Sequence, residues 1–228
     1  YNEAIRRKEG KGMDAQKAAR VMDELAKLYP EARPELHFSN PFETLIATIL
    51  SAQCTDRRVN QVTAKLFAQY PDAFAMAKLS PEELEPLIRE CGLYHNKAKN
   101  IAAVCRALVE HYGGEVPNTR EELMQLPGVG QKTAGVVLMA AFGDPQIPVD
   151  THVFRVSRRI GLADAGTPEK VELQLRALLP KEIWTFGHHL LIWHGRRCCA
   201  ARSPACERCP LNEELCERHM ESDEKSSK

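Results

Sequence analysis

One lysine lies where its amine could act as a nucleophile. Lys132 follows the turn Leu126-Pro-Gly-Val-Gly130, in the first turn of an apolar helix that we expect to end at Phe142. The positive end of the helix dipole disfavours an ammonium there, and a nearby apolar wall would add desolvation, so both effects favour a neutral amine. A neutral amine can attack a carbon and form a Schiff base. The alternative interpretation is an ordinary surface lysine.

An aspartate eighteen residues later is a second candidate. Asp150 lies in Val149-Asp-Thr-His-Val-Phe-Arg155, which begins another helix after Pro148. Asp150 or Thr151 is expected to be the N-cap of that helix, because short polar side chains accept hydrogen bonds from the first backbone N–H groups. A capping role alone would explain Asp150, so the residue type leaves a catalytic role open.

The two glycines before Lys132 could form an anion site. Gly128 and Gly130 let the backbone turn sharply and approach another surface closely, and the helix that follows begins with unpaired N–H groups. Such a turn can hold a phosphate without any charged side chain. A helix–helix connection whose glycines serve packing alone is the alternative.

Four cysteines near the C-terminus have the spacing of a metal site. The pattern is Cys199-x6-Cys206-x2-Cys209-x6-Cys216, with four thiols within 18 residues. Soft thiolates this close together suit a tetrahedral zinc ion or an iron-sulfur cluster. Zinc ribbons usually pair two Cys-x2-Cys units, and this chain has one. Cys198 would lengthen the first spacing to seven residues, so we interpret it as a bystander.

The remaining cysteines and the composition bound the class of protein. Cys54, Cys91 and Cys105 are expected to be buried thiols on helices. The N-terminus has no apolar core of a signal peptide and no window is long and apolar enough to span a membrane, so we expect an intracellular protein without a membrane partner. Lys and Arg number 31, as do Asp and Glu, so any binding to a polyanion must use local basic patches rather than a global field.

Helical periodicity and helix-capping signals recur along the whole chain and favour an all-α fold. Asn40-Pro-Phe-Glu43, Ser80-Pro-Glu-Glu83, Thr119-Arg-Glu-Glu122 and Thr167-Pro168 each have the form of a helix start. Gly113-Gly114 ends a further amphipathic helix. No segment shows the alternation of a strand, so about ten helices joined by short turns are expected.

Several motifs in one order resemble the helix-hairpin-helix, Gly/Pro-Asp superfamily of base-excision DNA glycosylases, and specifically its endonuclease III branch. The resemblance covers residues 14–218 approximately, and the order of the motifs makes it specific where any single one would be weak. The motifs are Leu50-Ser-Ala-Gln-Cys-Thr-Asp56, Gly92-Leu-Tyr94, Leu126-Pro-Gly-Val-Gly130 with Lys132, Val149-Asp-Thr-His152, His194-Gly-Arg196 and the cysteine pattern.

The resemblance implies roles for individual residues. Lys132 matches the family's catalytic lysine and Asp150 its catalytic aspartate, while the turn of Gly128 and Gly130 matches the hairpin whose amides hold a DNA phosphate. Two further matches involve the DNA stack: Gln53 matches the residue that fills the gap left by a flipped nucleotide, and Leu93 the wedge inserted beside it. From the residues alone, a polar helix end for Gln53 and a core leucine for Leu93 would be preferred.

The resemblance also implies a cofactor and a domain organisation. It favours a [4Fe-4S] cluster on Cys199, Cys206, Cys209 and Cys216, although the family's last spacing is five residues and here it is six. Two helical domains are expected: a central six-helix domain with the helix-hairpin-helix over 33–144, and a discontinuous cluster domain made of 14–32 and 145–220. Residues 1–13 and 221–228 are expected to be flexible, and the protein to be a monomer.

The implied function is that of a bifunctional DNA N-glycosylase and abasic-site lyase, which removes oxidised pyrimidines by a lysine Schiff base and β-elimination. Its partner is double-stranded DNA that contains oxidised pyrimidines or abasic sites. The related adenine-specific glycosylases are usually longer and do not place a lysine at the position of Lys132. A non-catalytic DNA-binding or redox-sensing iron-sulfur protein is the alternative of another class, and the presence of Lys132 together with Asp150 argues against it.

Overall fold

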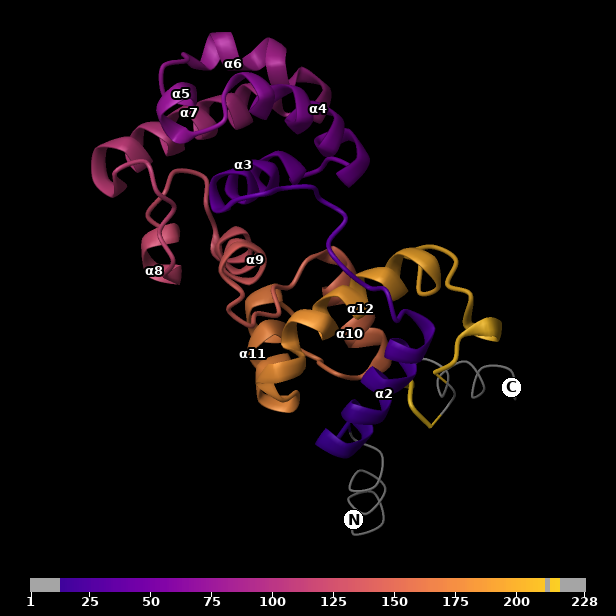
Figure 1. Cartoon of the computed structure of the whole chain (residues 1–228). Coiled ribbons are helices and arrows are strands. Elements are labelled where there is room, and N and C mark those ends of the chain that lie inside the picture. The colour runs from indigo at the N-terminus through magenta and orange to yellow at the C-terminus, as the bar shows by residue number, and fades with distance from the viewer. Residues whose placement is uncertain (1–12, 212–213, 218–228) are drawn as a thin grey trace. The chain divides into compact units, whose positions relative to one another are not determined.

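The expected all-α fold is confirmed. The computed structural model describes residues 13–211 and 214–217, and over these residues it contains eleven α-helices, three short 3-10 helices and no strand (Figure 1). The chain divides into two compact units. One unit is Pro34–Gln146, and the other combines the described residues before and after it. Most of the two terminal segments expected to be flexible lies outside the described residues.

The Pro34–Gln146 unit holds seven α-helices rather than the expected six, because two of them, α5 and α8, are single turns of four residues. Among the described residues no helix is long and apolar enough to cross a membrane. The elements of this unit are α3 (Pro41–Ser51), α4 (Asp56–Gln69), α5 (Ala73–Met76), α6 (Pro81–Ile88), η1 (Arg89–Cys91), α7 (Tyr94–Tyr112), α8 (Arg120–Leu123) and α9 (Gln131–Phe142).

Helix α3 forms the centre of the core of this unit. Every residue from 44 to 50 is buried, as expected of a helix that is apolar on all sides, and α3 packs against α4, α7 and α9. The predicted caps are confirmed at two helix starts. The Asn40 side chain accepts a hydrogen bond from the Glu43 amide, and Ser80 forms a complete capping box with Glu83. Local sequence signals therefore fix where these helices begin.

The second unit is built around α10 (Thr151–Ile160) and α12 (Trp184–Arg197), which pack closely against each other. Gly195 makes this approach possible, because a Cβ at that position would meet Val156 Cγ2 at 3.0 Å. The buried faces of α2, α10 and α12 contribute Leu25, Val153 and Leu191 to one apolar core. The elements of this unit are α2 (Ala15–Leu28), α10 (Thr151–Ile160), α11 (Pro168–Leu178), η2 (Lys181–Ile183), α12 (Trp184–Arg197) and η3 (Cys206–Arg208).

All eight cysteines are free thiols. Cys105 on α7 and Cys91 in η1 are buried, as expected. The expectation is wrong for Cys54, which is half-buried and lies in the turn between α3 and α4 rather than on a helix. The thiol of Cys54 nevertheless interacts with the thiol of Cys91, which links this turn to η1.

Candidate active site and metal site

The turn before α9 presents backbone N–H groups. Gly128 adopts a left-handed backbone with φ of +74°, and a Cβ there would lie 2.4 Å from the Asn100 side-chain amide. Gly130 forms the N-cap of α9 with an extended backbone, and no side chain of the described residues caps this helix. Val129 between them is buried and anchors the turn. The first amides of α9 are therefore free to bind an anion.

Lys132 is the second residue of α9, as the sequence predicts. Its side chain is exposed, and within residues 13–211 and 214–217 its ammonium makes no hydrogen bond or ion pair. Arg120 on α8 donates to the Gln131 carbonyl at 3.3 Å, which ties the start of α9 to the preceding helix. The structure thus fixes the backbone at Lys132 and leaves its amine unengaged.

Asp150 is the N-cap of α10, which settles the choice between Asp150 and Thr151. One carboxylate oxygen, Oδ1, accepts hydrogen bonds from the amides of His152 at 2.8 Å and Val153 at 2.7 Å. The capping role is therefore real, and the second oxygen is not needed for it. Asp150 belongs to the second unit and Lys132 to the first.

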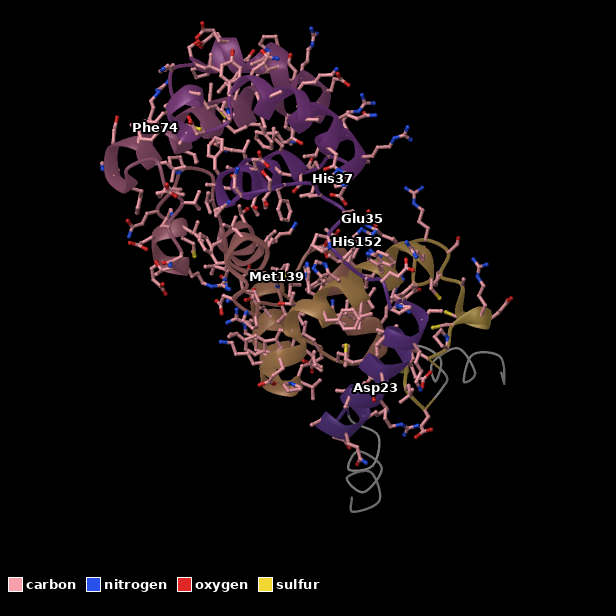
Figure 2. All side chains as sticks on the ribbon, viewed as in Figure 1. Asp23, Glu35, His37, Phe74, Met139 and His152 are labelled. Carbon is pink, nitrogen blue, oxygen red and sulfur yellow. The ribbon has the colours of Figure 1, made fainter. Side chains whose placement is uncertain are left out.

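His152, whose part in the site the sequence leaves open, lies on α10 and is labelled in Figure 2. Its Nδ1 lies 3.2 Å from the Arg155 guanidinium. Burial lowers the pKa of His152, with Asp150 opposing that shift and Arg155 adding to it. The imidazole is therefore neutral at pH 7, and it can accept a hydrogen bond from Arg155.

Gln53 and Leu93 share an unusual backbone conformation. With φ of 52° and 47°, they are the two non-glycine residues of the described chain that lie in the left-handed region. A left-handed backbone costs an L-residue roughly 1–2 kcal/mol, and such strain concentrates at functional sites. Leu93 is 53% exposed, so the interpretation as a core leucine is wrong. Gln53 is also exposed, two residues beyond the end of α3.

The cysteine-rich segment encloses a small pocket. Its lining includes all four cysteines of the predicted ligand set and, in addition, Cys198. The thiol of Cys198, the thiol of Cys209 and an imidazole nitrogen of His194 lie within 4.8 Å of one another. The lining residues are Ile160, His194, Cys198, Cys199, Pro204, Cys206, Cys209 and Cys216.

Two arginines of α10 hold the backbone around this pocket. Arg159 donates to the carbonyls of Ala200 at 2.7 Å and Ala201 at 2.8 Å, and it reaches the Cys199 sulfur at 3.5 Å. Arg155 donates to the carbonyls of Gly195 at 2.9 Å and Cys199 at 3.2 Å. Helix α10 thereby supports the loop after α12 through its backbone carbonyls.

His194 is a buried member of the pocket that motif spacing did not identify as such. Burial lowers the pKa of His194 to about 4, so the ring is neutral, and burial raises the pKa of Tyr29 to about 12, so the phenol keeps its proton. The Tyr29 hydroxyl lies 3.3 Å from His194 Nδ1 and can donate to it. The ring proton then belongs on Nε2, which lies 3.7 Å from the Cys209 sulfur.

The donor set of the pocket fits a bound metal group. Burial raises the pKa of the Cys209 thiol to about 12, so a free thiolate is unstable there without a positive centre. Clustered thiols of this kind fit a soft metal ion or an iron-sulfur group. Cys198 is part of the pocket, so its interpretation as a bystander needs the direct test given below. The last spacing includes residues 212 and 213, which lie outside the described residues.

Comparison with known proteins adds independent information on these residues. The chain matches the HhH-GPD superfamily of base excision DNA repair proteins over residues 46–181. It is 50% identical to the endonuclease III of Synechocystis sp. over 198 residues, which cover 86% of this chain and 90% of the relative. It is 47% identical to that of Escherichia coli (strain K12) over 205 residues, which cover 90% of this chain and 97% of the relative.

Solved structures also resemble this chain. An endonuclease III in a non-covalent complex with DNA superposes with a TM-score of 0.87 at 48% identity, covering 93% of this chain and 99% of that chain. A thermostable thymine-DNA glycosylase follows with a TM-score of 0.81 at 26% identity, covering 90% of this chain and 98% of that one. Likeness of this extent, over nearly the whole of each chain, means that the protein belongs to the endonuclease III family within the HhH-GPD superfamily of base excision DNA repair proteins.

Proposed function

We propose that this chain is a base-excision repair enzyme that removes oxidised pyrimidines from double-stranded DNA and then cleaves the strand at the abasic site. The observation that carries the proposal is the position of Lys132, an exposed and unpaired amine in the first turn of α9, directly after a glycine turn with free N–H groups. A phosphate bound at that turn would place a nucleotide of the same strand beside the amine.

Lys132 supplies the nucleophile. A damaged base is unreachable inside the duplex, so the nucleotide must first be rotated out of the stack. The neutral amine then attacks C1′, and the base leaves with the electrons of the glycosidic bond and gains a proton. Opening of the sugar ring gives an imine between Lys132 and C1′. The imine makes the 2′ proton acidic, and its loss expels the 3′ phosphate. Water then releases the enzyme from the unsaturated sugar.

Asp150 is proposed to support the reaction through the carboxylate oxygen that capping does not require. The Oδ1 atom is held by two amides of α10, which orients the carboxylate. The negative charge can stabilise the developing sugar cation or accept a proton from the Lys132 ammonium. A side chain fixed in this way loses little freedom on reaction.

Replacement of Asp150 separates capping from catalysis. Asparagine caps helices as well as aspartate does, so Asp150→Asn should keep the melting temperature close to that of the wild type and lower base excision by about 10²-fold or more. Asp150→Ala should lose the same activity and also about 1 kcal/mol of unfolding free energy. Single-turnover excision and thermal unfolding measure the two effects. An active Asp150→Asn enzyme would leave Asp150 with the capping role only.

Gly128 and Gly130 allow a test of the phosphate site, because they respond differently to a methyl group. Gly130 has nothing within 4 Å of an added Cβ, so Gly130→Ala should fold normally. The added methyl group would nevertheless lie next to the free amides of α9 and hinder a phosphate there, so DNA binding should weaken by about tenfold or more. Gly128→Ala should itself lose about 1–2 kcal/mol of stability from the left-handed backbone. Unchanged DNA affinity of Gly130→Ala in a titration would place the phosphate elsewhere.

The cluster site is proposed to hold a [4Fe-4S] group on Cys199, Cys206, Cys209 and Cys216. A group closed by four protein thiolates has no position for substrate, so its effect is to fix the surrounding loop. That loop presents Arg202 and Arg208, both exposed, as candidate phosphate contacts. Arg155 and Arg159 support the loop by donating to the carbonyls of Cys199 and Ala200.

The activity is tested by strand incision on a panel of duplexes, each with one oxidised pyrimidine, one abasic site, or adenine opposite an oxidised guanine. The proposal expects incision at oxidised pyrimidines and abasic sites, with none at the mispaired adenine. Adenine release without strand cleavage would instead indicate a monofunctional enzyme. Binding without any incision would indicate a non-catalytic DNA-binding protein. Light scattering of the same preparation tests the proposed monomeric state.

A further inference from the structure

A buried lysine lies between the two loops that carry Gln53 and Leu93. Lys97 is on the first turn of α7 and is only 4% exposed. Its ammonium donates to the Leu50 carbonyl at 2.9 Å and to the Cys91 carbonyl at 2.8 Å. One cation therefore bonds to two segments that are 41 residues apart in the sequence.

The two carbonyls belong to element ends that lead directly into the strained residues. Leu50 is in the last turn of α3, three residues before Gln53, and Cys91 ends η1, two residues before Leu93. The last carbonyls of a helix have no helical partner and carry its negative end, which suits an ammonium. Lys97 thus supplies a hydrogen-bond donor to the ends of both α3 and η1, shortly before the two left-handed non-glycine residues of the described chain.

The surroundings of Lys97 show that it is not an ordinary packing residue. Burial lowers the pKa of Lys97, while the thiols of Cys91 and Cys54 oppose that shift. Burying an ammonium is costly, so the presence of Lys97 needs a reason other than packing. The two carbonyls supply one, because an apolar side chain would leave both of them unpaired. The contact between Cys54 and Cys91 is a second link between the same two loops.

We propose that Lys97 is a positioning residue that fixes the Gln53 and Leu93 loops relative to each other, so that both side chains enter the DNA stack together when the nucleotide is flipped. This inference rests on the proposed function and on the roles that the family resemblance implies, in which Gln53 fills the gap and Leu93 is the wedge. Lys97 touches no substrate. It acts through the backbone carbonyls of Leu50 and Cys91.

A double-mutant cycle in the full chain tests the proposal. Lys97→Met should slow single-turnover excision of a paired oxidised pyrimidine on the order of 10–100-fold, because small displacements of positioning groups have large kinetic effects. Incision at a preformed abasic site should fall less, since no base leaves the stack. In a Leu93→Ala background, Lys97→Met should cost clearly less than it does in the wild type, because displacement of the Leu93 loop no longer matters and only that of the Gln53 loop remains. If the rate losses of the two single variants multiply in the double variant, the two residues act independently and the proposal is overturned.

Two further variants separate positioning from general destabilisation. Lys99→Met makes the same substitution at an exposed position of the same helix and should leave excision unchanged. Lys97→Arg keeps a cation with several donors and should recover most of the activity. Should Lys97→Met fail to fold, Lys97→Gln carries the same cycle. If every folded Lys97 variant excises the base at the wild-type rate, Lys97 has only a structural role.

Hydrogen exchange tests the same contact without any activity. In Lys97→Met the amides of residues 51–54 and 91–94 should exchange faster than in the wild type, while those of α9 stay unchanged. A wild-type protein that excises no oxidised pyrimidine would refute the proposed function but would leave this exchange result to decide whether Lys97 joins the loops. Unchanged exchange in both segments would refute the link itself.

Discussion

Lys132→Ala should abolish strand cleavage at abasic sites, with a loss of roughly 10³-fold or more in the single-turnover rate. Removal of the amine removes the covalent route that the proposed mechanism requires. Because Lys132 is exposed and unpaired in the described residues, its loss should change the melting temperature very little. DNA binding should remain within about tenfold, since one phosphate-proximal charge supplies a small part of the affinity.

A matched variant separates the nucleophile from its charge. Lys132→Arg keeps a positive side chain at the start of α9 and keeps the electrostatic attraction to DNA, but a guanidinium is always protonated and cannot attack C1′. Both variants should therefore lose cleavage equally, while Lys132→Arg binds DNA as the wild type does. Recovery of cleavage by Lys132→Arg would assign an electrostatic role to Lys132 and leave the nucleophile unidentified.

Cys199→Ala should lose the cluster, whereas Cys198→Ala should keep it. Wild-type protein is expected to be brown with about four irons per chain. Loss of one of four thiolates should remove iron, colour and solubility together, because the thiols of the pocket are then left without their positive centre. Cys198 lies in the same pocket and its thiol donates to the Ala205 carbonyl at 3.5 Å, so the neighbouring variant is a demanding control.

Iron analysis and visible absorption of anaerobically purified protein decide the ligand set. Stoichiometric zinc in place of iron would contradict the cluster. A colourless Cys198→Ala protein beside a brown Cys199→Ala protein would mean that Cys198, and not Cys199, is the ligand. Loss of iron and colour in both variants would mean that the cluster needs Cys198 as well as Cys199. Cys216→Ala, at the far end of the irregular spacing, should behave as Cys199→Ala does.

The starts of helices could be predicted from the sequence because their signals are local. The Asn40 and Ser80 caps need only the residues of one turn, and so does the placing of Lys132 in the first turn of α9. Asp150 is similar, since its carboxylate bonds to amides two and three residues away. For such residues the chain itself supplies both partners of the interaction, and residue type and spacing suffice.

Tertiary packing determined what the sequence did not reveal. The pocket around Cys198 depends on Arg159 reaching residues about 40 positions away, and no local spacing shows that contact. The left-handed backbones of Gln53 and Leu93 are not typical of their residue types. Lys97 had a detectable signal, because it precedes Ile101 by four residues and thus continues the buried face of α7. A lysine in register with an apolar face indicates a buried cation.

Borohydride trapping followed by peptide mapping is the most direct test of the central claim. The enzyme is mixed with a duplex containing one oxidised pyrimidine and reduced during turnover, which converts an imine into a stable bond between protein and DNA. The proposed mechanism expects a cross-linked species whose single modified peptide contains Lys132, and no cross-link in Lys132→Ala. A cross-link on another residue, or excision of the base without any trappable intermediate, would contradict it.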